Sequence, residues 1–154
     1  MTDRINIIEA LPDLYQSMRS WADDVAKAAA NAGVDRLLVE LVKIRASQIN
    51  GCAFCLDMHN ADAVKLGENP RRLFVLDAWR ETELFTDQER AALELTEHVT
   101  RLSQTQGVPD DVYERATAAF TEDQYSAVLW MILVINSWNR IAVPSHTKLP
   151  RRAK

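Results

Sequence analysis

Hydrophobic positions recur at helical spacing along most of the chain, and glycines and prolines interrupt that recurrence. The clearest stretch covers residues 36–50, where apolar residues three, four and seven positions apart share one face of a helix. Those residues are Leu37, Leu38, Leu41 and Ile44. Asp35 precedes the stretch as a helix N-cap and Gly51 follows it as a stop. The pattern therefore predicts a helix between these two residues.

The same signals divide the whole chain into seven predicted helices. They cover approximately residues 12–31, 35–50, 52–66, 69–81, 86–102, a segment that begins at 109, and 121–143. Thr86 with Glu89, and Thr121 with Gln124, have the spacing of a capping box at the starts of the fifth and seventh helices. We expect a single all-α domain over residues 1–143 and a short basic tail over 144–154.

The last predicted helix is apolar on every side from Val128 to Ile135. A helix of that kind must be surrounded by protein. The other predicted helices are short, which favours an oligomer interface. Asn136, Asn139 and Arg140 follow on the same helix and need polar partners if they are buried, such as Glu40 or a neighbouring subunit.

Composition and charge narrow the class of protein. The 154 residues include only 4 glycines, where average usage of about 7% would give about 11, so helices are favoured over turn-rich β structure. The 18 basic and 22 acidic residues give a net charge of −4, which argues against a nucleic-acid surface.

The sequence also bears on location. The most apolar stretch of the chain, Ala127 to Ile135, is too short to span a bilayer, so we expect no membrane partner. The first residues lack the pattern of a signal peptide, and we expect a cytoplasmic protein. Lys148, Arg151, Arg152 and Lys154 make the tail basic, and we expect it to be solvated.

The reactive side chains converge in the segment Cys52-Ala-Phe-Cys55-Leu-Asp-Met-His59. At about 100° per helical residue, Cys52, Cys55 and His59 fall within a sector of about 60° and share a face. Cys55 and His59 are four residues apart, so the imidazole can take the thiol proton. The segment also begins a helix, whose N-terminal amides lower a thiol pKa, and this effect favours Cys52. A close cysteine pair in a cytosolic protein indicates redox or metal chemistry.

Three other interpretations of the pair are weaker. Haem attachment is excluded because Leu56, not histidine, follows Cys55. A zinc site formed by Cys52, Cys55 and His59 lacks an evident fourth ligand, and we expect neither a metal nor another cofactor. Two inert, buried cysteines are the remaining alternative.

Glu40 is the carboxylate best placed to serve His59. Its helix neighbours are apolar, so it lies beside or within the buried stripe. If the chain folds back at Gly51, Glu40 can approach His59, orient the imidazole and raise its basicity. The alternative is a surface glutamate paired with Lys43 or Arg36.

The run from Glu40 to His59 resembles the core motif of the alkyl hydroperoxidase D-like (AhpD-like) family, within the carboxymuconolactone decarboxylase superfamily. The shared pattern is a glutamate twelve residues before a C-x-x-C, with histidine four residues after the second cysteine. Segments around Trp79 and from Asn136 to Arg140 resemble other parts of such proteins. The resemblance covers roughly residues 35–143 and implies an all-helical domain that assembles as homotrimers or hexamers.

The resemblance also implies a thiol-dependent peroxidase that reduces alkyl hydroperoxides. Cys55 would attack the peroxide and become a sulfenic acid, and Cys52 would condense with it to form a disulfide. Glu40 and His59 would relay protons, and an external dithiol would reduce the disulfide. A lipoyl-type dithiol is a candidate reductant on the resemblance alone. Two other functions stay open, a cofactor-free decarboxylase of the wider superfamily and a redox-responsive assembly without turnover.

Overall fold

Ten helical segments make up the regular structure of residues 2–150, the part of the chain that this computed structural model describes. They are α1 (Ile7–Ala10), α2 (Pro12–Asn31), α3 (Arg36–Asn50), α4 (Ala53–Lys65), α5 (Pro70–Phe74), the 3₁₀ helix η1 (Leu76–Glu81), α6 (Asp87–Thr100), α7 (Leu102–Thr105), α8 (Asp110–Ala119) and α9 (Glu122–Ala142). This part of the chain contains no strand, which confirms the predicted all-α class. None of its helices is long and apolar enough to cross a membrane.

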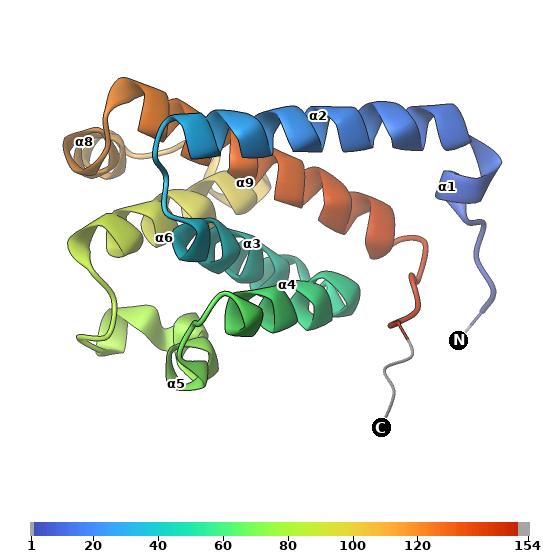
Figure 1. The fold of residues 1–154 in the computed structure, drawn as a ribbon, viewed down its shortest axis with the longest axis horizontal. Coiled ribbons are helices and arrows are strands. Elements are labelled where there is room, and N and C mark those ends of the chain that lie inside the picture. Colours follow the sequence, from blue (N-terminus) through green and yellow to red (C-terminus); the bar gives the residue numbers. More distant parts are fainter. Residues whose placement is uncertain (1, 151–154) are drawn as a thin grey trace.

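The helix α3 is the centre of the arrangement. It packs against α4, α6 and α9, while α2 lies along α9 and α8 packs on α6 (Figure 1). Its buried residues Leu38 and Val42 join side chains of α2, α6, α8 and α9 in the largest core cluster. Leu41 and Ile44 belong to a second cluster with residues from α4, α6 and η1. A single helix thus holds the two halves of the core together and carries Glu40 into the interior.

Local capping explains where the helices around the site begin and end. The Asp35 carboxylate accepts hydrogen bonds from the backbone N–H groups of Leu37 and Leu38, at 2.8 and 3.1 Å. Gly51 ends α3 in the left-handed conformation, with φ of 66°. Thr86 and Thr121 both form the predicted capping boxes. These boundaries agree with the prediction because each depends on residues within one helical turn.

The structure departs from the predicted helices before Pro12, at Val75 and at Thr100. The short helix α1 precedes Pro12 and is capped by Asn6, which the pattern did not indicate. The helix expected over 69–81 breaks at Val75 and continues as the 3₁₀ helix η1. Ala78 departs from helical geometry within this segment, and Leu76 and Trp79 on either side of it are both buried in the core. The helix expected to reach Leu102 ends at Thr100, and α7 follows it.

The apolar helix α9 is covered mainly by the chain's own α2, α3 and α6. Met131, Ile132 and Ile135 are buried, whereas Trp130 and Leu133 remain 51% and 38% exposed. Most of the helix is therefore covered within the domain, whereas its apolar sequence favoured cover by a second subunit. Assembly as a homo-oligomer stays a prediction, and Trp130 and Leu133 are the large apolar side chains of α9 that a second subunit would cover.

Glu97 on α6 is the centre of a buried charge network. It accepts hydrogen bonds from Arg45 Nε at 2.8 Å, Trp79 Nε1 at 2.8 Å and Arg80 Nη1 at 2.6 Å. Arg45 also contacts Asp77. Burial alone would raise the pKa of Glu97, but the hydrogen bonds from Arg80 and Trp79 and the nearby charge of Arg45 hold it below its usual range. The face of α6 that carries Glu97 is therefore part of the interior and not a solvated surface.

The two ends of the described chain meet on one side of the molecule (Figure 1). The Arg4 guanidinium donates to the backbone carbonyl of Pro144 at 3.2 Å. The segment after α9 turns at His146, whose φ is positive, and the Thr147 N–H bonds to the carbonyl of Ala142. Of the predicted basic tail, Arg151, Arg152 and Lys154 lie outside the described residues.

Candidate active site

The turn between α3 and α4 places the cysteine pair. Gly51 reverses the chain, and the Cys52 N–H donates to the carbonyl of Ser47 at 3.0 Å. Cys52 is therefore the N-cap of α4. The sequence pattern predicted it as the first residue of the helix, one position too early. The Cys52 sulfur accepts a hydrogen bond from the backbone N–H of Cys55 at 3.4 Å. The thiol takes the place that a serine or aspartate side chain usually fills at a helix start.

Glu40 and His59 meet in the interior, as predicted. Glu40 Oε2 lies 2.8 Å from His59 Nδ1, and each residue is only 7% exposed. Lys43 donates to the other carboxylate oxygen, also at 2.8 Å, so Glu40 pairs with both His59 and Lys43. Burial alone would raise the pKa of Glu40, but the bond to His59 and the charge of Lys43 hold it below its ordinary value. An ionised carboxylate only accepts, so Nδ1 donates and the neutral ring keeps Nε2 as a base.

The two thiols share their hydrogen bonds unequally. Both cysteines are unbridged and buried, at 1% exposure for Cys52 and 2% for Cys55. The Cys55 thiol donates toward Cys52, and this bond lowers the pKa of Cys52 to about 6 against the opposing effect of burial, with help from the Cys55 N–H and Asn139. The same shared proton, together with burial, raises the pKa of Cys55. Near neutral pH the charge of the pair therefore rests on Cys52, as the helix dipole predicted.

The lowered pKa of Cys52 predicts a pH-dependent stability of the reduced protein. Between pH 6 and pH 9 the unfolded chain binds a proton at Cys52 that the folded chain has released. The free energy of unfolding should therefore increase with pH across this range and fall as the pH drops through 6. Urea unfolding at several pH values would measure the slope. In Cys52→Ser the increase should disappear, and an unchanged slope in that variant would contradict the assignment.

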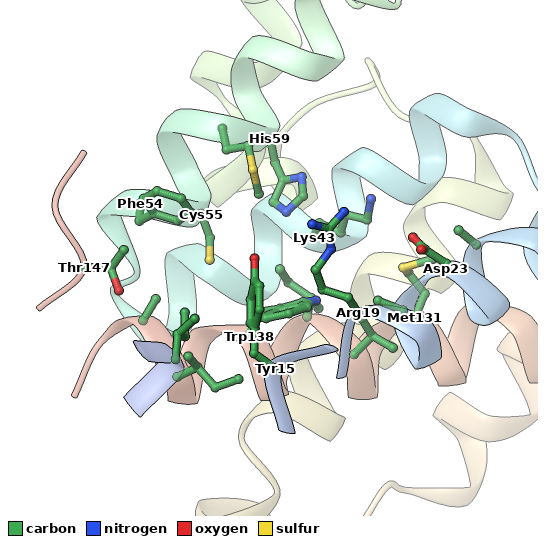
Figure 2. Close-up of a pocket in the computed structure, with 18 residues that line it drawn as sticks. Tyr15, Arg19, Asp23, Lys43, Phe54, Cys55, His59, Met131, Trp138 and Thr147 are labelled. Atoms are coloured by element: carbon green, nitrogen blue, oxygen red, sulfur yellow. The ribbon is translucent and has the colours of Figure 1, made fainter. Parts of the chain in front are cut away.

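A cavity of about 390 Å³ opens beside the cysteine pair. Figure 2 shows Cys55 and His59 on one wall, from α4, and Tyr15 and Arg19 entering from α2, with Trp138 of α9 beneath. Most of its other lining is apolar, with Ile135 and Met131 from α9 and Phe54 from α4. Cys55 lines this cavity and Cys52 does not. A small molecule that enters it reaches the Cys55 sulfur first.

A ladder of buried amides and hydroxyls supports the pair from behind. Asn139, 1% exposed, donates to Ser47 Oγ at 3.0 Å and accepts from Asn50 at 2.8 Å. Asn136 donates to Thr100 Oγ1 at 3.0 Å. The asparagines predicted to need polar partners therefore find them within the domain, but they do not bond Glu40. Arg140 donates to the side chain of Asn136 at 2.8 Å.

The described residues do not assemble the zinc site considered from the sequence. The group whose ligand atoms lie within 4.8 Å of one another comprises Glu40, His59 and Asp62, without either cysteine. Lys43 already pairs with Glu40 at 2.8 Å, and Lys65 with Asp62 at 3.3 Å. Each carboxylate thus has a cation, and the cysteines stay available as thiols.

Sequence reasoning missed the part of the site that α2 contributes. Tyr15 and Arg19 are four residues apart on α2 and therefore share a face, but nothing in the sequence indicates which helix that face meets. Lys43 was foreseen only as a surface partner of Glu40. His98 and His146 do not line the cavity.

Comparisons with known proteins identify the family of the chain. Residues 12–98 match the model of the carboxymuconolactone decarboxylase family. The chain is 42% identical over 143 residues to the uncharacterized protein YdfG of Bacillus subtilis, covering 93% of this chain and 94% of the relative. It is 35% identical over 92 residues to the uncharacterized protein YnjA of Escherichia coli, covering 59% and 48%.

A solved structure gives the same result for the fold. It is a protein of unknown function from Agrobacterium tumefaciens for which the role of the antioxidant defence protein AhpD has been suggested. The two chains are 33% identical, with a TM-score of 0.87 over 98% of this chain and 100% of the other. The chain described here belongs to the carboxymuconolactone decarboxylase family and has an AhpD-like fold.

Proposed function

We propose that the protein is a thiol-dependent peroxidase that reduces organic hydroperoxides through a Cys52/Cys55 dithiol–disulfide cycle, with Glu40 and His59 as its proton relay. The observation that carries the proposal is the shared cavity. Cys55 and His59 open onto it side by side, while Glu40 holds His59 from behind at 2.8 Å. An accessible thiol, a base and an apolar space for a substrate therefore coincide.

The chemistry balances with these groups alone up to the disulfide. The Cys55 thiolate attacks the terminal oxygen of R–O–OH, the O–O bond breaks, and the products are a Cys55 sulfenic acid and an alkoxide. The alkoxide takes a proton and leaves as an alcohol. Cys52 sulfur then attacks the Cys55 sulfenic sulfur and expels hydroxide, which leaves as water after protonation. The peroxide gains two electrons and the two cysteines lose them.

Proton transfer links the two cysteines to His59. The resting charge lies on Cys52, so Cys55 must lose its proton before it can attack. His59 Nε2 is the base available on the cavity wall, and the ionised Glu40 stabilises the imidazolium that forms. Cys52 then already carries the negative charge needed for the second step. The external dithiol, for which a lipoyl-type compound is one candidate, reduces the disulfide by thiol–disulfide exchange.

The test is a single-turnover oxidation of the reduced protein. One equivalent of cumene hydroperoxide should remove two titratable thiols and two mass units, and release one equivalent of cumyl alcohol. Retention of both thiols in the wild-type protein would overturn the proposal. An activity that survives replacement of both cysteines would point instead to a cofactor-free decarboxylase. A disulfide that forms only with disulfide donors would indicate a redox-responsive protein without peroxidase turnover.

A further inference from the structure

Tyr15 contributes a polar group to the cavity that the dithiol cycle does not yet use. Its hydroxyl points into the cavity, on the side where Cys55 and His59 lie (Figure 2). It makes no hydrogen bond to any residue between 2 and 150, unlike Glu40 and His59, which are paired with each other. A hydroxyl in a largely apolar cavity without a protein partner is free to donate to a bound molecule.

The ring that carries this hydroxyl is held in place. It meets the Trp138 ring edge to face, with centroids 5.8 Å apart. The Arg19 guanidinium lies over it at 6.0 Å from the centroid. A donor fixed by its neighbours before the substrate arrives costs little reorganisation during the reaction, which is the condition for effective stabilisation of a developing negative charge.

We propose that Tyr15 is a catalytic residue that protonates the leaving oxygen of the hydroperoxide. The inference rests on the proposed peroxidase function and adds the acid that its first step lacks. As the Cys55 thiolate bonds to the terminal oxygen and the O–O bond breaks, the Tyr15 hydroxyl gives its proton to the departing alkoxide. The products are the Cys55 sulfenic acid, the alcohol and a Tyr15 phenolate, which recovers a proton from the His59 imidazolium. The proton that His59 took from Cys55 thereby ends on the alcohol.

The variant Tyr15→Phe tests this role by its dependence on the leaving group. An alkoxide is a poor leaving group and needs an acid, whereas the acetate that leaves from peracetic acid does not. The rate constant of thiol loss with tert-butyl hydroperoxide should fall by about 10²-fold, and that with peracetic acid by less than about tenfold. Phenylalanine keeps the ring that packs on Trp138. Circular dichroism and the rate of Cys55 alkylation would confirm that the fold and the thiol are intact.

Tyr113→Phe is the matched control, because Tyr113 is exposed and meets Tyr125 on the surface formed by α8 and α9. It should react as the wild type does with both oxidants. Equal losses with the two oxidants in Tyr15→Phe, or no loss with either, would overturn the inference. In wild type, ring-substituted cumene hydroperoxides should show a shallow dependence on leaving-group basicity, and a steep dependence would also overturn it. If wild type forms no disulfide with any peroxide, the proposed function itself fails.

Discussion

Cys55→Ser should lose all reaction with hydroperoxide, whereas Cys52→Ser should still react once and stop at a sulfenic acid. The reason is the different position of the two sulfurs. Cys55 lines the cavity, and Cys52 lies behind it as the cap of α4. Low pKa alone would favour attack by Cys52, but a nucleophile must also reach the peroxide. The cavity therefore decides the assignment in favour of Cys55.

Dimedone trapping with peptide mapping would measure this difference. Cys52→Ser treated with one equivalent of cumene hydroperoxide should carry one dimedone adduct, on Cys55. Cys55→Ser should carry none, and its remaining thiol, Cys52, should be lost no faster than in a sample without peroxide. An adduct on Cys52 in Cys55→Ser would reverse the roles of the two cysteines without excluding a peroxidase.

Glu97→Ala should destabilise the fold by about 3–5 kcal/mol, the usual effect of breaking a buried ion pair. The substitution removes the acceptor that Arg45, Trp79 and Arg80 share. The Arg45 side chain is only 6% exposed and would keep a buried charge with fewer partners. Urea unfolding of the reduced protein, monitored by circular dichroism, would give the change in free energy of unfolding.

Glu94→Ala on the same helix is the control. Glu94 pairs with Arg115, which is half exposed, at 2.9 Å, and with Arg80 at 3.7 Å. Solvent-exposed pairs of this kind contribute about 0–1 kcal/mol, so its loss should be small. Similar losses in both variants would contradict the importance assigned to burial around Glu97. Neither residue lines the cavity beside Cys55, so the oxidation of Cys55 in folded Glu97→Ala should match the wild type.

The fold was predictable where the determinants are local. Asp35, Gly51 and the capping threonines act within one turn, so their residue types alone located both ends of α3 and the starts of α6 and α9. The break at Val75 is different. Leu76 and Trp79 pack against core residues of other helices, and a local stretch of sequence does not show those contacts. The same limit explains why nothing in the sequence indicated the network at Glu97, since its partners are up to 52 residues away in the chain.

The candidate site follows the same division. Glu40, Cys52, Cys55 and His59 lie on two consecutive helices joined by one turn, so their spacing was enough to bring them together. Their catalytic roles remain part of the proposal. Tyr15 reaches the cavity only because α2 packs along α9, a long-range contact between helices 90 or more residues apart in sequence. The position of Cys52 at the start of a helix predicted that its pKa is the lower of the two. The main cause of the difference, however, is the hydrogen bond between the two thiols.

The burial of both sulfurs also has a consequence for timing. Thiol–disulfide exchange requires an incoming thiolate to approach one sulfur in line with the bond that breaks, so access sets its rate. With both cysteines almost wholly covered, bulky thiols such as glutathione would exchange slowly even where equilibrium favours reduction. A small peroxide has the cavity as its entrance. The disulfide form would therefore persist until a reductant narrow enough to enter the cavity reduces it. The redox state of the cysteine pair would then follow exposure to peroxide and not the redox state of the general thiol pool.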